Sequence, residues 1–191
     1  MVAEVLLIAA LAQTWIPIDG WKETPFQRQV KGKIEDGQIT LGPGAPLAGV
    51  NRSEPLPVRS NYEIRYEAMR VKGNDFFASL TFPVGDSFCT FVTGGWGGDI
   101  VGLSSIDNWD ASENETRSYF TFENGRWYAF RIQVSDDRIR AWIDEKIIVD
   151  VQIAGRKISL RPGETKLTVP LGLMSYSTLG MIRKVEYRTT H

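Results

Sequence analysis

Hydrophobic and polar residues alternate along much of this chain with a period of two, which is typical of β-strands rather than helices. The alternation is clearest between Trp127 and Ile153, where two turns separate three alternating runs. The apolar positions of these runs are Tyr128, Phe130, Ile132 and Val134, then Ile139, Ala141 and Ile143, then Ile147, Val149, Val151 and Ile153. Successive side chains of a strand point to opposite sides of a sheet, so this segment predicts a three-stranded antiparallel meander.

The rest of the chain after residue 20 also lacks a sustained helical period and carries further strand patterns. We expect a hairpin over 31–41 around Asp36-Gly37, a long strand over 61–71, central strands over 76–82 and 88–93 joined by a turn at 83–86, and two final strands over 167–176 and 179–188. In the long strand, Tyr62, Ile64, Tyr66 and Ala68 share one face. About a dozen short strands in one chain predict an all-β fold of two packed sheets or a barrel.

Composition fits one such domain. The chain has 191 residues, of which 42% are hydrophobic and 24% are charged, so a sizeable core can be buried. The formal net charge is −1 and no basic stripe is present, which argues against a nucleic-acid partner. The six Trp residues provide either core volume or flat surfaces on which sugar rings can stack.

Two scarce residue types exclude several kinds of active site. The single cysteine, Cys89, cannot form an intramolecular disulfide and lies in an apolar run, which predicts a small buried side chain rather than a nucleophile. The only histidine is the last residue, His191. A Ser-His-Asp triad, a Cys-His pair and a site with several His ligands are therefore not expected.

The N-terminus carries an apolar segment, Val5–Ala12, that is too short to span a bilayer. It ends in Ala10-Leu11-Ala12, a small-x-small pattern typical of a signal-peptide cleavage site, although Glu4 stands where a basic residue is usual. The alternative is an apolar strand or helix of the mature fold. We predict a signal peptide over 1–12, a single domain over 13–191, and a secreted or periplasmic bacterial protein without a membrane span.

The polar face of the predicted meander contains Arg131, Gln133, Arg140 and Trp142, which point away from the core positions. One interpretation is a solvated sheet face on which Arg stems cover the Trp ring. The other is a ligand face, with Trp142 as a stacking surface and the Arg and Gln side chains as donors to sugar hydroxyls.

A glycine-rich segment, Thr93–Asp99, contains four glycines around Trp96. Glycine permits unusual backbone angles and close approach, so the segment could present Trp96 to a ligand. A β-bulge or a tight corner of the sheet would use the same residues. No Lys-Ser or Lys-Thr follows, so this is not a phosphate-binding loop.

The segment from Asp107 to Glu115 is the densest cluster of oxygen ligands in the chain, and three interpretations remain open. It could be a solvated loop. It could bind Ca²⁺ through Asp107 and Asp110, although the spacing is not that of an EF-hand. It could supply the carboxylates of Glu113 and Glu115 as acid and base beside Trp109.

Several of these segments, taken in order, resemble the 3-keto-disaccharide hydrolase domain family of the concanavalin A-like lectin/glucanase superfamily. The similar motifs are Asp19-Gly20-Trp21, Ile34-Glu35-Asp36-Gly37-Gln38-Ile39, Tyr62-Glu63-Ile64, Gly125-Arg126-Trp127-Tyr128, the run Asp137–Asp144 and Leu171-Gly172-Leu173. The resemblance covers residues 15 to 188. It implies a jelly-roll sandwich of two antiparallel sheets and a carbohydrate or glycoside as partner.

The resemblance also implies an activity on 3-keto-glycosides, by hydrolysis or by lyase and hydratase steps. Many family members carry a Gln-x-His-Gly-like stretch after the Leu171–Leu173 strand, whereas Met174-Ser175-Tyr176-Ser177 stands here. Two hypotheses follow. In the first, the protein is an enzyme with Glu113 or Glu115 as base and Arg140 as electrostatic stabiliser. In the second, it is a non-catalytic carbohydrate-binding module that uses Trp96, Trp109 and Trp142. A structural domain without a sugar site is a third.

Overall fold

The computed structural model describes residues 14–28 and 32–190. The signal peptide predicted for residues 1–12 and the terminal His191 lie outside the described residues. Within them, no helix is long and apolar enough to cross a membrane.

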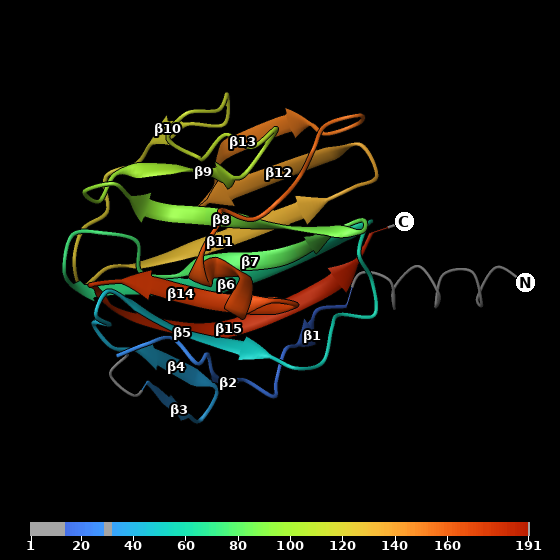
Figure 1. Ribbon diagram of the computed structural model, residues 1–191. Coiled ribbons are helices and arrows are strands. Elements are labelled where there is room, and N and C mark those ends of the chain that lie inside the picture. The colour runs from blue at the N-terminus through green and yellow to red at the C-terminus, as the bar shows by residue number, and fades with distance from the viewer. Residues whose placement is uncertain (1–13, 29–31, 191) are drawn as a thin grey trace, which may run out of the picture.

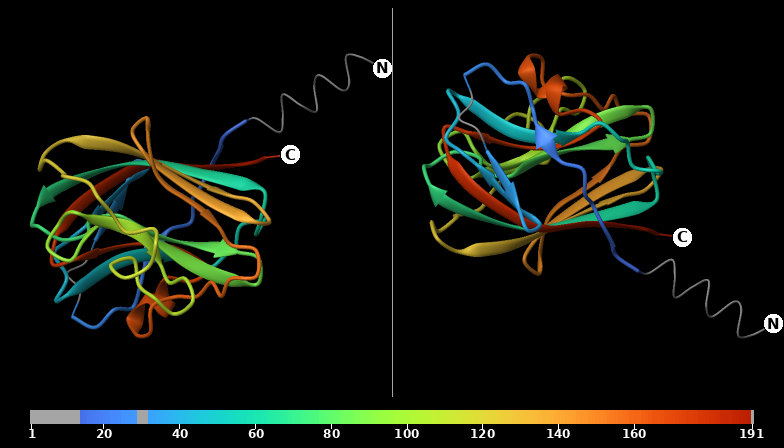
Figure 2. Two further views of the ribbon diagram at one scale, coloured as in Figure 1. Left: turned by 90° about the horizontal axis from the view of Figure 1, so that it is seen from above. Right: turned by 90° about the horizontal axis from the view of Figure 1, so that it is seen from below.

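Two antiparallel sheets pack face to face (Figures 1 and 2), which confirms the predicted all-β sandwich. We call the first sheet A, with the order β13-β12-β11-β6-β15-β4-β3 and β1 paired to β15. Its strands are β1 (Ile16–Pro17), β3 (Lys33–Glu35), β4 (Gln38–Leu41), β6 (Tyr62–Lys72), β11 (Trp127–Val134), β12 (Arg138–Ile143), β13 (Lys146–Gln152) and β15 (Leu179–Thr189). The predicted meander forms β11, β12 and β13 at one edge of this sheet.

The second sheet, sheet B, has the order β10-β9-β8-β7-β14-β5-β2. Its strands are β2 (Lys22–Glu23), β5 (Leu47–Arg52), β7 (Ser79–Val84), β8 (Ser87–Gly95), β9 (Ile100–Ser104), β10 (Ser118–Tyr119) and β14 (Leu171–Tyr176). A short 3₁₀ helix, η1 (Glu164–Thr168), lies over the outer side of sheet B (Figures 1 and 2).

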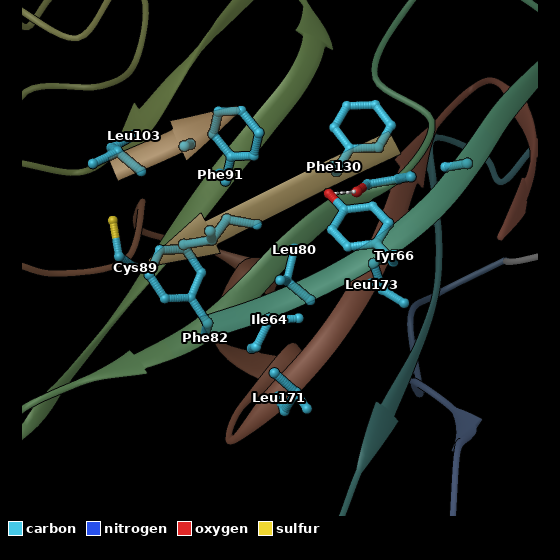
Figure 3. Packing of buried hydrophobic residues seen from close by; sticks show 14 of the residues in the cluster. Ile64, Tyr66, Leu80, Phe82, Cys89, Phe91, Leu103, Phe130, Leu171 and Leu173 are labelled. Atoms are coloured by element: carbon cyan, nitrogen blue, oxygen red, sulfur yellow. Dashed lines mark hydrogen bonds between the residues drawn. The ribbon is translucent and has the colours of Figure 1, made fainter. Parts of the chain in front are cut away.

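The core lies between the sheets and is built from the inward faces of the alternating strands. Tyr62, Ile64, Tyr66 and Ala68 of β6 are at most 1% exposed, as their shared face predicted. Tyr66 stacks on Phe130 with ring centroids 5.0 Å apart and donates its hydroxyl to the Ala78 carbonyl at 3.0 Å (Figure 3). The buried hydroxyl is therefore satisfied while its ring contributes to the core.

Cys89 is buried in this core, as predicted, and burial raises the pKa of its thiol to about 12. It therefore packs as a small hydrophobic side chain and stays protonated at neutral pH.

Several strand boundaries differ from the sequence-based prediction, and the strand expected from Phe76 begins only at Ser79. Pro83 and Val84 belong to β7 instead of the predicted turn, which is confined to Gly85 and Asp86. Proline has no backbone N–H to donate to a neighbouring strand. It is tolerated at residue 83 because β14 pairs only with residues 79–81 of β7, so no hydrogen bond to β14 is needed there. The strand expected from Leu167 begins only at Leu171, because η1 occupies the preceding residues.

Candidate functional site

A cavity of about 380 Å³ opens on the outer face of sheet B. Its floor consists of side chains from the four central strands, which alternate with the core residues of the same strands. These floor residues are Ser79, Thr90, Val92, Ser104 and Met174. The segment leading into η1 forms one wall, so a chain region that lies outside both sheets closes the side of the cavity.

Three aromatic side chains line the cavity: Phe76, Trp96 and Tyr176. Trp96 and Tyr176 are each 40% exposed, which is unusual for rings of this size. The Phe76 and Tyr176 rings lie 5.7 Å apart at an angle of 49°. The rim of the cavity thus offers apolar ring surfaces to a ligand.

Charged groups stand beside these rings. Asp75, Arg161 and Glu164 all line the cavity. The Arg161 guanidinium lies 5.7 Å from the centre of the Trp96 ring and pairs with the Asp110 carboxylate at 3.0 Å. The Asp75 carboxylate accepts the backbone N–H of Phe76 at 2.8 Å. The lining therefore combines aromatic ring faces with negatively and positively charged hydrogen-bonding groups, as ligand pockets commonly do.

The glycine-rich segment positions Trp96 through unusual backbone angles. A bulge interrupts the pairing of β8 and β9 between Thr93 and Gly95, and Trp96 itself has a φ of 51°. At Gly98, φ is 115° and a Cβ would stand 2.6 Å from the Asn74 carbonyl oxygen. The β-bulge interpretation is therefore confirmed, and the same bulge leaves the Trp96 ring exposed beside the cavity.

A buried arginine holds the same segment from inside. Arg70 is 8% exposed and has no carboxylate among its hydrogen-bond partners. It donates to the carbonyls of Gly98 at 3.3 Å and Phe122 at 2.5 Å, and to the Asn124 side chain at 2.6 Å. Burial lowers the pKa of its guanidinium. Arg70 occupies a core-facing position in the alternation of β6, and a charged residue at such a position is a signal that the sequence itself carries.

The acidic segment over 107–115 does not converge on the cavity. Asp107 and Glu115 both bind Arg156, each at 2.6 Å, and the Lys157 backbone N–H and Arg156 lower the pKa of Asp107. Arg156 also lowers the pKa of Glu115. Glu113 is exposed, and Trp109 is 58% exposed and outside the cavity lining.

Asp110 alone among these predicted residues contacts the cavity lining. It accepts a hydrogen bond from Ser104 and pairs with Arg161, both of which line the cavity. The predicted Ca²⁺ ligands Asp107 and Asp110 therefore contact different partners. Among the described residues, no three His, Cys, Asp or Glu side chains are grouped so as to hold a metal ion.

The predicted face of the meander is confirmed. The Arg131 guanidinium lies 3.7 Å from the centre of the Trp142 ring, and Arg140 donates to Gln133 at 3.2 Å. These side chains lie on the outer face of sheet A, across the sandwich from the cavity. The hypothesis of one sugar-binding site that uses both Trp96 and Trp142 does not fit this geometry, because Trp96 lines a cavity on sheet B and Trp142 lies on sheet A.

The cavity residues missed by the sequence analysis come from segments far apart in the chain. Phe76 lies before β7, and Tyr176 is the last residue of β14. Arg161 lies before η1, and Glu164 is its first residue. None belongs to a local motif. Only the glycine-flanked Trp96 carried a signal that pattern analysis could detect.

Several solved structures share this fold. The carbohydrate-binding module CBM66 from Bacillus subtilis aligns with a TM-score of 0.61 at 13% identity, covering 90% of this chain and 97% of that module. A putative glycosyl hydrolase from Parabacteroides distasonis aligns with a TM-score of 0.55 at 12% identity, covering 90% and 89%. Domain 4 of the GH43 extracellular arabinanase AbnA from Geobacillus stearothermophilus, solved with arabinotriose, gives 0.54 at 12% identity, covering 89% and 82%. At these identities the similarity establishes the fold alone.

No curated protein matches the chain in sequence. A family model described as the 3-keto-alpha-glucoside-1,2-lyase-like domain matches residues 17–190, which is nearly the whole of the described structure. This agrees with the resemblance found in the sequence motifs. The chain therefore belongs to the 3-keto-alpha-glucoside-1,2-lyase-like domain family, a family of carbohydrate-active domains.

Proposed function

We propose that this domain binds a short glycoside in the cavity on sheet B. The observation that carries the proposal is the composition of the lining, in which three aromatic rings stand beside Asp75, Arg161 and Glu164. The cavity volume of about 380 Å³ lies within the range of ligand pockets. Its size suits one or two sugar units rather than a long chain.

The two kinds of lining group have separate tasks in this proposal. Trp96 and Tyr176 contact the apolar C–H face of a sugar ring, while Arg161 and the Thr90 hydroxyl bind its hydroxyl groups. Arg161 is held by Asp110 at 3.0 Å, so its guanidinium loses less freedom on binding. The 40% exposure of Trp96 leaves its ring accessible to a ligand.

Replacing Trp96 with Ala is expected to weaken binding of the preferred disaccharide roughly fivefold to tenfold, because a stacked ring is worth about 1 kcal/mol beyond the area that it buries. Calorimetry with a panel of ordinary and 3-keto disaccharides measures the effect. Trp109→Ala and Trp142→Ala are the matched controls, since neither side chain lines the cavity. A loss with Trp142→Ala and none with Trp96→Ala would move the sugar site to sheet A, to the ligand face that was one of two interpretations of the meander.

Catalysis is a second candidate function, favoured by the presence of two carboxylates, Asp75 and Glu164, in one cavity. A 3-keto group acidifies the C2 proton of a glycoside. One carboxylate removes that proton, the C1–O bond breaks, and the other group, in its acid form, protonates the leaving oxygen. The products are an alcohol and a 3-keto sugar with a C1–C2 double bond. Arg161 stabilises the enolate oxygen that develops.

Turnover of 3-keto-glycosides is expected to fall about 100-fold in Asp75→Asn and in Glu164→Gln, because each amide keeps the shape of the side chain and loses its proton transfer. Product formation on the same disaccharide panel measures this, and calorimetry confirms that binding persists. Glu113→Gln, Glu115→Gln and Arg140→Gln test the residues first predicted from the sequence. If any of those three variants loses turnover while Asp75→Asn and Glu164→Gln stay active, the catalytic residues are the ones predicted from the sequence and not the cavity carboxylates. If the wild-type protein shows no turnover, the catalytic proposal is rejected and only the binding function remains.

Export belongs to this proposal as well. A glycoside-binding domain that follows a signal peptide over residues 1–12 would meet its ligand in the periplasm or outside the cell. The apolar run and the Ala10-Leu11-Ala12 pattern support this localisation.

A further inference from the structure

The outer face of sheet A, on the opposite side of the sandwich from the cavity, carries a surplus of positive charge. Ion pairs on this face join seven cationic side chains to four carboxylates. The cations are Arg65, Arg131, Arg138, Arg140, Arg183, Lys184 and Arg188, and the carboxylates are Glu63, Glu67, Asp150 and Glu186. Three positive charges therefore remain uncompensated within this set, on a protein whose formal net charge is −1.

Nearby acidic residues do not cancel this surplus at the centre of the face. Asp136, Asp137, Asp144 and Glu145 lie in the turns at the two ends of the β11–β12–β13 meander. Asp136 accepts hydrogen bonds from Ser60 and Asn61, and Asp144 pairs with Arg126. The excess positive charge arises where two cations share one carboxylate, which is the case at Glu63, Glu67 and Asp150.

Two of the arginines lie directly opposite each other. Arg65 of β6 and Arg131 of β11 are cross-strand partners, an arrangement of like charges that is unfavourable by itself. Each is held by one carboxylate and one ring. Arg65 pairs with Glu186 at 2.6 Å and lies 4.2 Å from the centre of the Trp15 ring. Arg131 pairs with Glu63 at 3.1 Å and lies 3.7 Å from the centre of the Trp142 ring.

This arrangement leaves donors that are both free and fixed in position. A guanidinium has five N–H donors, and the ion pairs of Arg65 and Arg131 use only part of them. The two side chains remain 46% and 38% exposed. Because ring stacking already orders the guanidinium planes, the arginine side chains lose less conformational entropy when an anion binds them.

We propose that this face binds an acidic polysaccharide whose uronate carboxylates pair with the central arginines. A guanidinium group can bind a carboxylate through two parallel N–H···O hydrogen bonds in one plane, which is a bidentate pair. Arg65 and Arg188 lie over the Trp15 ring at 4.2 and 4.6 Å, and Arg131 lies over the Trp142 ring at 3.7 Å. Both Trp side chains stay partly exposed, and a sugar unit can contact the ring surface that the arginines leave uncovered. The four strands from β15 to β12 span roughly 14 Å across, so the face suits an extended chain lying on the sheet rather than a single sugar in a pocket. The site is separate from the cavity and does not depend on the function proposed for it.

Polygalacturonate is the probe for this site. Affinity electrophoresis and calorimetry at low ionic strength are expected to show binding that weakens as salt is added, because exposed charges are screened over a distance of about 10 Å at 0.1 M salt. The fully methyl-esterified polymer, which keeps the sugar and lacks the charge, is expected not to bind. Polyglutamate, which keeps the carboxylates and lacks the sugar rings, is expected to bind more weakly.

The double variant Arg65→Gln/Arg131→Gln is expected to bind polygalacturonate about fivefold more weakly, since an exposed charge pair contributes up to about 1 kcal/mol. Arg117→Gln/Lys157→Gln removes the same charge from exposed loops adjoining sheet B and is expected to keep full affinity. If the double variant fails to fold, the single variant Arg65→Gln leaves the Glu63 ion pairs intact and is measured instead. Equal losses in the variant and its control, no binding by the wild type, or equal binding of polyglutamate or duplex DNA would each overturn the proposal.

Discussion

Replacing Arg70 with Met is expected to lower the free energy of unfolding by about 3 kcal/mol, because it leaves the buried carbonyls of Gly98 and Phe122 without their donor. Arg70 is itself 8% exposed and holds those carbonyls at 3.3 and 2.5 Å. Since Gly98 belongs to the segment that presents Trp96, the variant is also expected to lose affinity for the glycoside. Urea unfolding measures the first effect and calorimetry the second.

An exposed arginine provides the matched control for Arg70. Arg126 stacks over the Tyr128 ring at 4.5 Å and pairs with Asp144 at 3.0 Å, but its side chain is 52% exposed. Arg126→Met is therefore expected to cost less than about 1 kcal/mol and to leave glycoside affinity unchanged. If the two variants lose equal stability, or if Arg70→Met binds the glycoside as tightly as the wild type, Arg70 does not position the Trp96 segment.

Replacing Glu63 with Ala is expected to cost about 3 kcal/mol, the lower end of the range for removing one partner of a buried ion pair. The Glu63 side chain is 3% exposed and binds Arg131 at 3.1 Å and Arg188 at 2.6 Å. Gln133 donates to the same carboxylate at 3.2 Å. The two arginines are 38% and 28% exposed and can turn toward water, which keeps the cost at that lower end. Thermal and urea unfolding measure the loss.

Two variants separate the charge of Glu63 from its packing. Glu63→Gln keeps an acceptor oxygen and the side-chain volume, so we expect it to recover part of the stability that Glu63→Ala loses. Glu186→Ala removes the carboxylate of a pair whose arginine, Arg65, is 46% exposed, and is expected to cost less than about 1 kcal/mol. A cost for Glu63→Ala no larger than that for Glu186→Ala would show that the Glu63 ion pairs add little to folding.

The sequence predicted those parts of the structure that depend on neighbours in the chain. The two-residue period assigned the inward face of β6 and the meander of β11, β12 and β13, because alternation of side chains is a local property of a strand. It also placed Arg131, Gln133, Arg140 and Trp142 on one face. The glycines around Trp96 indicated a bulge or a loop that could present the Trp ring for the same reason, since positive φ angles are set by local geometry.

Only the tertiary structure decided which faces and loops come together. Nothing in the local pattern states that β11 and β12 belong to sheet A and the strands beneath Trp96 to sheet B, so the predicted site combined residues from opposite sides of the molecule. Phe76, Arg161 and Tyr176 reach Trp96 through the packing of segments that are distant in sequence. Glu113 and Glu115 formed a plausible acid–base pair in the sequence, but the fold pairs Glu115 with Arg156 and leaves Glu113 exposed and away from the cavity. Strand periodicity is encoded by adjacent residues, whereas a cavity is formed by long-range contacts, and that is why the sequence predicted the strands more completely than the site.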